Sequence, residues 1–93
     1  MAKNDDNKVF IGRKKTMNYV MAAMMVLNDK PVRLLARGRS ISLAVDVAEI
    51  LMNRFIKGCT YGEIIIGTET ITNTDGTSSN VSSMEIEIIP PKK

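Results

Sequence analysis

The sequence predicts an α/β fold of the two-layer α+β type, ordered β-α-β-α-β-β, with two helices on one face of a mixed four-stranded sheet. Three observations predict it: two apolar segments of helical period, a short β-rich segment before each, and a C-terminal third with strand-like alternation. The chain has 93 residues, of which 44% are hydrophobic and 25% are charged. We therefore expect a single globular domain over residues 1–93 with one modest core.

The first 58 residues contain a polar tail and two strand-helix units. Apolar residues surround the first helical segment almost completely, whereas Asp46, Glu49, Asn53 and Lys57 recur as one polar stripe along the second. The expected elements are a flexible tail over 1–7, a strand over 8–11, a helix over 17–27 after the N-cap Thr16, a strand over 32–36, and a helix over 41–57 between the N-cap Ser40 and the stop Gly58.

The last third of the chain predicts a long C-terminal β-hairpin. Isoleucine-rich and alternating segments flank an Asp75-Gly76 turn. If that dipeptide forms a two-residue loop, Ile65 lies opposite Ile86. Residues 68–83 are too polar to pack in a core, so we expect them to project from the domain as an arm.

Composition argues against an enzyme or a metalloprotein. The chain has no histidine and one cysteine, Cys59, so we expect no zinc site, no intrachain disulfide and no activated thiol nucleophile. Asp46 and Glu49 belong to a solvated stripe rather than to an acid-base pair. We predict no catalytic residues, no cofactor and no metal. Aromatic residues make up 4% of the chain, which argues against base-stacking platforms.

Targeting signals are also missing from the sequence. The first ten residues are polar, and the longest nearly uncharged apolar segment is too short to span a bilayer. Together with the lone cysteine, this pattern predicts a cytoplasmic protein without a membrane partner.

Positive charge is concentrated in the first part of the chain. Residues 1–57 hold eleven Lys and Arg against five Asp and Glu, whereas residues 58–93 hold two against five. Two clusters stand out, Arg13-Lys14-Lys15 and Arg37-Gly38-Arg39, each between a strand and the following helix. A strand-helix-strand unit makes its two strands parallel, so both clusters should reach the same edge of the sheet. Cations at helix N-termini are unfavourable for stability, which indicates a polyanionic partner such as nucleic acid.

Four groups of short motifs follow one another along the chain. They are Ile11-Gly12 through Met17-Asn18-Tyr19-Val20, Ala36-Arg37-Gly38-Arg39 with Ile41-Ser42 and Ala44-Val45-Asp46, Asn53-Arg54-Phe55, and Asp75-Gly76 before Val81-Ser82. Together, over about residues 8 to 89, they resemble the Alba family of archaeal chromatin proteins.

The resemblance implies a nucleoid-associated, chromosome-bound protein that acts as a homodimer. Its hairpins would project as two arms along double-stranded DNA, and its nucleic-acid-binding residues would be Arg13, Lys14, Lys15, Asn18, Tyr19, Arg37 and Arg39. The resemblance also implies association between dimers through Arg54 and Phe55. An RNA-binding or RNA-chaperone function on the same surface is the alternative, because Alba-like domains serve both nucleic acids.

This chain departs from the family pattern at several places. Arg13 stands where the family has a regulated lysine, so control by lysine acetylation is not expected. Leu35, Leu43 and Met52 occupy positions that are often basic, and the hairpin tip from Asp75 to Asn80 carries no arginine. We expect fewer phosphate contacts, and therefore weaker or more selective binding than is typical of the family.

Overall fold

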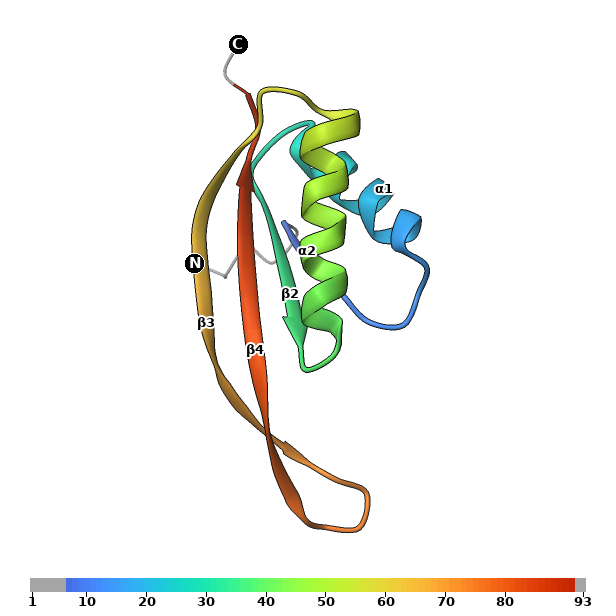
Figure 1. The fold of residues 1–93 in the computed structure, drawn as a ribbon, viewed down its shortest axis with the longest axis vertical. Helices are drawn as coiled ribbons and strands as arrows, with labels where there is room; N and C mark the ends of the chain where they lie inside the picture. The colour runs from blue at the N-terminus through green and yellow to red at the C-terminus, as the bar shows by residue number, and fades with distance from the viewer. Residues whose placement is uncertain (1–6, 92–93) are drawn as a thin grey trace.

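Two helices lie against one face of a four-stranded sheet in this computed structural model, which describes residues 7–91 (Figure 1). The elements in chain order are β1 (Lys8–Phe10), α1 (Thr16–Leu27), β2 (Val32–Arg37), α2 (Ser40–Ile50), a π-helical turn η1 (Leu51–Phe55), β3 (Thr60–Thr72) and β4 (Ser78–Ile89). This arrangement confirms the predicted α+β fold class and element order.

The sheet has the strand order β1-β2-β4-β3. β1 is parallel to β2, as expected for two strands joined by a crossover helix, and the remaining neighbours are antiparallel. The core lies between the sheet and the helices, where β2 and β4 present alternate residues such as Leu34, Ile86 and Ile88 to Val20 of α1 and Val47 of α2. Within residues 7–91 no helix lies over the opposite face of the sheet (Figure 1).

The hairpin register differs by one residue from the predicted one. Thr72 pairs with Ser78, the Asn73 N–H donates to the Thr77 carbonyl at 2.7 Å, and Gly76 adopts a φ of +91°. The loop therefore has three residues and ends on a left-handed glycine, which is the next most common hairpin after the two-residue type. As a result Ile64 lies opposite Ile86, and Ile65, which we expected there, lies opposite Glu85 on the other face of the sheet.

Both predicted N-caps are wrong by one residue. Thr16 and Ser40 are the first helical residues, and the N-cap positions belong to Lys15 and Arg39. In the second case the turn at Gly38, with φ of +55°, brings Arg39 into the helical conformation one residue early.

The second helix also ends differently from the prediction. It changes to the π-helical turn at Leu51 and ends at Phe55, where the Ile56 N–H donates to the Leu51 carbonyl at 2.9 Å.

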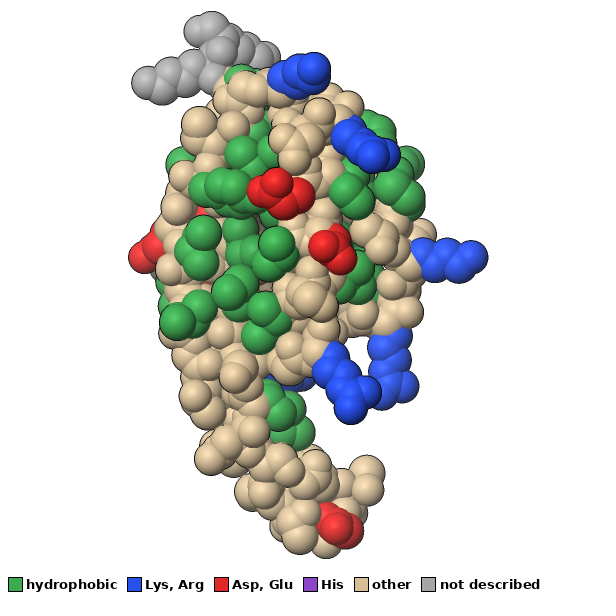
Figure 2. All heavy atoms as spheres, in the orientation of Figure 1, with side chains coloured by type: hydrophobic (Ala, Val, Ile, Leu, Met, Phe, Trp, Pro, Cys, Tyr) green, Lys and Arg blue, Asp and Glu red, His purple; other side chains and the backbone are tan. Residues whose placement is uncertain are grey.

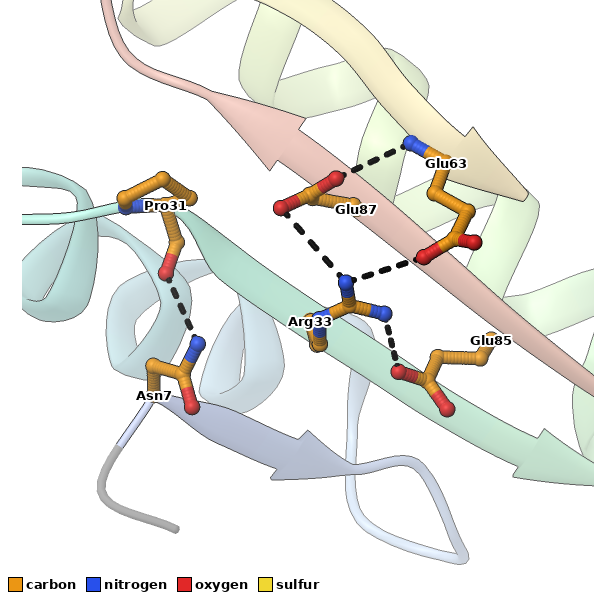
Figure 3. A network of polar contacts seen from close by, with 6 residues as sticks. All are labelled: Asn7, Pro31, Arg33, Glu63, Glu85 and Glu87. Atoms are coloured by element: carbon orange, nitrogen blue, oxygen red, sulfur yellow. Dashed lines mark hydrogen bonds and ion pairs between the residues drawn. The ribbon is translucent and has the colours of Figure 1, made fainter. Parts of the chain in front are cut away.

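The amino-terminal boundary of the described chain is fixed by Asn7. Its side-chain amide donates to the Pro31 carbonyl at 3.3 Å (Figure 3), and its own backbone carbonyl accepts the Arg33 N–H at 2.8 Å. Asn7 therefore belongs to the folded domain, although we predicted it as part of the tail. The rest of that predicted tail, residues 1–6, lies outside the described residues.

An ionic network crosses the uncovered face of the sheet at its upper end. The Arg33 guanidinium donates to the Glu85 carboxylate and to Glu63 at 3.1 Å, and it lies 3.7 Å from Glu87 (Figure 3). These contacts, led by the hydrogen bond to Glu85, raise the pKa of Arg33 above its ordinary value. Because Arg33 and Glu85 are half-buried, the network joins β2, β3 and β4 more firmly than an exposed ion pair would.

Substituting Arg33 tests the contribution of this network. Arg33→Met should lower the free energy of unfolding by about 1–2 kcal/mol, because three carboxylates then face one another without their cation. Arg33→Lys should recover only part of the loss, since an ammonium group cannot reproduce the planar fork. Denaturant unfolding measures both, with Lys57→Met as the exposed control, and equal losses for Arg33→Met and Lys57→Met would contradict the account.

Candidate nucleic-acid interface

Five exposed cations gather where α1 and α2 begin. Since β1 and β2 are parallel, the loops that follow them leave the sheet at the same end and lead into the two helix N-termini. Figure 2 shows Lys and Arg side chains at this end of the body, beside the root of the hairpin arm. The group, called the basic rim from here on, consists of Arg13, Lys14, Lys15, Arg37 and Arg39.

The helix starts at the basic rim have no side-chain caps. Neither Lys15 nor Arg39 makes a capping hydrogen bond, and the first turns of α1 and α2 contain no acidic residue. The first backbone N–H groups of both helices are therefore not satisfied by a capping side chain. These donors and the positive ends of the helix dipoles add to the charge of the cations, so the rim favours an anionic ligand.

Tyr19 supports the rim from underneath. Its hydroxyl accepts the backbone N–H groups of Gly12 at 2.9 Å and Lys14 at 2.8 Å, while the side chain packs in the core with 6% exposure. The geometry gives Tyr19 a positioning role for the 12–15 loop rather than a surface for contact. Asn18, by contrast, is exposed on the first turn of α1, next to the basic cluster.

Two contacts join the arm to the rim in addition to the sheet pairing of Arg37 with Ser83. Glu69 of β3 accepts a hydrogen bond from Arg37 at 3.3 Å, and the Gly38 N–H donates to the Ser82 carbonyl at 2.8 Å. Beyond them the hairpin extends past the end of β2 (Figure 1). Sequence reasoning missed the Arg37–Glu69 pair because 32 residues separate its members and only the hairpin register brings them together.

Arg54 and Phe55 lie far from the rim, at the opposite end of α2. Both are exposed on the π-helical turn, so the structure does not bring them to the same site as the five cations.

The remaining candidates for chemistry have structural partners. Glu49 accepts hydrogen bonds from Asn53 at 3.1 Å and from the Tyr61 hydroxyl, and burial together with this bond raises the pKa of Tyr61 to about 12. Cys59 is buried, and burial raises the pKa of its thiol. Among residues 7–91 no group of three or more acidic, histidine or cysteine side chains could hold a metal ion. No helix in the same range has the length and apolar character needed to span a membrane.

An apolar patch lies between α2 and β3 on the helix-covered side of the sheet. Val45, Ile64 and Ile66 are 41%, 52% and 73% exposed, and Figure 2 shows the green side chains that cover this part of the body. The revised hairpin register is what places Ile64 and Ile66 on this face. A patch of this kind on a small domain is typical of a protein interface.

The fold and the rim define a small α+β domain with a positively charged edge, and the comparisons with known proteins identify its family. Residues 7–73 match the sequence model of the Alba family. The chain belongs to the Alba family.

Individual relatives agree with this assignment. The chain is 49% identical over 84 residues to the DNA/RNA-binding protein Alba of Methanothrix thermoacetophila, covering 88% of this chain and 93% of the relative. The structure of Alba from Thermoplasma volcanium superposes with a TM-score of 0.83 at 47% identity, covering 89% of this chain and 99% of that one. The fold also matches ALBA1 from Trypanosoma brucei, with a TM-score of 0.76 at 24% identity over 97% of this chain and 74% of that one. The curated relatives are named for binding and not for catalysis.

Removing the Tyr19 hydroxyl tests how the rim is positioned. Tyr19→Phe should leave the two loop N–H groups without their acceptor, so their amide hydrogens should exchange faster and stability should fall by about 1–2 kcal/mol. Tyr61→Phe is the matched control, because it removes a hydroxyl that bonds to Glu49 at a distance from the loop. Unchanged exchange at Gly12 and Lys14 in Tyr19→Phe would contradict the positioning role.

Proposed function

We propose that this protein binds nucleic acid through the phosphate backbone, with the basic rim as its main contact surface. The observation that carries the proposal is the convergence of five exposed cations on two helix starts that have no caps. Phosphates spaced along a nucleic acid can engage the cations and the helix N–H groups together, and this binding requires no base-specific contact. The names of the curated relatives, which are DNA/RNA-binding proteins, support the same function.

Double-stranded DNA is the partner we propose first, with chromosome association as the cellular role. A rim of charges on short loops suits a regular array of phosphates, and it needs no aromatic side chains for stacking. RNA on the same surface is the second candidate, which the relatives' names support equally. Competition between a DNA duplex and a structured RNA at equal salt separates the two.

The binding unit is proposed to be a homodimer. Val45, Ile64 and Ile66 leave an apolar surface that a second copy can cover, and closed pairs are the commonest oligomers of soluble proteins. Arg54 and Phe55, at the far end of α2, are proposed to join neighbouring dimers along the nucleic acid.

We propose that the arm extends the contact surface along the nucleic acid but contributes little to the binding affinity. Over residues 68–83 its ionisable groups are Glu69 and Asp75, so it can touch a backbone through hydroxyl, amide and N–H groups but releases no counterions. Binding is therefore expected to be weaker, or more selective, than in family members with basic arms.

Salt dependence tests the basic rim directly. If about five phosphates are neutralised per protomer, the logarithm of affinity should fall with the logarithm of salt concentration with a slope of about −4 to −5 per protomer. Arg37→Ala with Arg39→Ala should make that slope shallower by about two, and Lys57→Ala is the control outside the rim. Fluorescence anisotropy with duplex DNA measures the slopes, and an unchanged slope in the double variant would rule out the rim as the contact surface.

Light scattering tests the proposed dimer. At micromolar concentration the protein should have a mass about twice 10.3 kDa, and Ile66→Asp should reduce it to the monomer mass because a charge cannot be buried at the apolar patch. Met25→Asp, at an equally exposed methionine of α1, should remain dimeric. A monomeric native protein, or a dimer that survives Ile66→Asp with its circular dichroism unchanged, would contradict the assignment.

A further inference from the structure

A groove opens at the root of the arm, where the carboxyl ends of β1 and β2 meet the hairpin. It has a volume of about 750 Å³ and is lined by residues of all four strands, of the loop after β1, and by Ser40 at the start of α2. This size lies in the range of small-molecule sites. The groove opens largely on the sheet face that the helices leave uncovered, so it is distinct from the apolar patch beside α2.

The hairpin has little side-chain bulk beside the groove at Gly67. Gly67 of β3 lies opposite Ser83 of β4, and a Cβ atom added at Gly67 would meet only the Ser83 hydroxyl, at 3.5 Å. Glycine within a strand weakens the strand, and it commonly marks a place where a ligand or another backbone approaches closely. Among the described residues no other atom comes within 4 Å of that added Cβ, and Gly67 shares its face of β3 with the lining residues Ile65 and Glu69, so a ligand in the groove can approach the strand closely at this point.

One wall of the groove is flat and apolar. Phe10 of β1 lies beside Leu35 of β2 on the uncovered face, and Ile65 of β3 lies in the same row on the far side of Glu85. Phe10 is 69% exposed and Ile65 is 43% exposed. We expected no base-stacking platform from the low aromatic content, yet one of the four aromatic rings is held open to solvent on this face.

The neighbouring wall of the groove is positively charged, which suits a phosphate. Arg13 and Arg37 line the same groove as Phe10. Glu69 pairs with Arg37 at 3.3 Å, and Glu85 is held by Arg33, so each lining carboxylate has a cation beside it. An anion that displaced Glu69 would gain the Arg37 guanidinium, with Arg13 on the same side of the groove.

A flat apolar wall beside two arginines calls for a ligand with a planar ring and a phosphate. In a duplex the faces of the bases are covered by their neighbours, so only an unpaired nucleotide can offer its ring to Phe10. An aromatic side chain and an arginine together are how proteins bind single strands without sequence preference.

We propose that this groove binds an unpaired nucleotide of a single-stranded segment, with its base stacked on Phe10 and its phosphate between Arg13 and Arg37. The inference rests on the proposed function in one respect, because Arg13 and Arg37 also belong to the basic rim. It goes beyond that function in assigning a second ligand, unpaired nucleic acid, to a face of the sheet outside the rim. A strand that leaves a duplex or an RNA stem could therefore continue from the rim into the groove.

The test compares two probes of equal length and equal charge per strand, a single-stranded RNA oligomer and a DNA duplex, at one salt concentration. Phe10→Ala should weaken binding of the single strand about tenfold and leave duplex affinity within about twofold, since stacking contributes roughly this much per base. Phe10→Leu should show nearly the same loss, because it keeps apolar area without a flat ring. Met25→Ala, an exposed apolar residue on α1, is the control and should change neither affinity.

Two further variants test the groove while Phe10 is left unchanged. Gly67→Val fills the space above the strand with a residue that strands favour, and it should reduce single-strand binding while preserving the fold. Glu69→Gln removes the carboxylate that competes for Arg37, and it should strengthen binding of the single strand. In the native protein the ring protons of Phe10 should shift upfield on titration with the single strand, whereas those of Tyr61, whose hydroxyl bonds to Glu49, should not.

The outcomes separate this proposal from the proposed function. Unchanged single-strand affinity in both Phe10→Ala and Gly67→Val would overturn the groove and leave the duplex-binding rim intact. Equal losses for the duplex and the single strand would also overturn it, because the groove would then have no preference for unpaired bases. A native protein that binds the duplex but no single strand would overturn the groove as a nucleotide site and would favour a protein partner for this face. A native protein that binds neither probe would overturn the basic rim as well.

Discussion

The parallel pairing of β1 with β2 is the constraint on which the rest of the structure depends. It makes two loops that are more than twenty residues apart in the chain leave the sheet at the same end, and each loop leads directly into a helix. Without it Arg13 and Arg37 would lie at opposite ends of the domain. With it, the cations and the helix starts without side-chain caps form one edge, and their positive potentials add to one another, which costs some stability and favours an anionic ligand.

The hairpin adds a second constraint, because its register decides which side chains of β3 lie on each face of the sheet. The left-handed Gly76 sets a three-residue loop, and the resulting register turns Ile64 and Ile66 toward the helix side and Ile65 toward the uncovered side. The first pair extends the apolar patch of α2, which we assign to the dimer. Ile65 instead joins Phe10 on the face that also holds the Arg33 network, so the loop set by one glycine separates the surface we propose for the dimer from the groove we propose for a nucleotide.

Most of the fold could be predicted from the sequence, because the segments with helix-like and strand-like apolar patterns are long and are separated by clear turn signals. The convergence of the two basic clusters followed from topology alone. What could not be predicted depended on contacts across strands or on single backbone conformations: the hairpin register, the helix starts at Thr16 and Ser40, and the pairing of Glu69 with Arg37. Tyr19 was assigned to the site through a family motif, and only the structure gives the reason, a buried hydroxyl that holds the loop.

The central claim is that nucleic acid lies on the edge formed by the two helix starts. Backbone amide chemical shifts recorded during titration with a short DNA duplex test it most directly, because every non-proline residue from 7 to 91 reports its own surroundings. The account predicts the largest changes over residues 12–16 and 38–41, with smaller changes along the arm. Changes confined to the hairpin tip, or spread over α1 and the apolar patch with the helix starts unaffected, would contradict it.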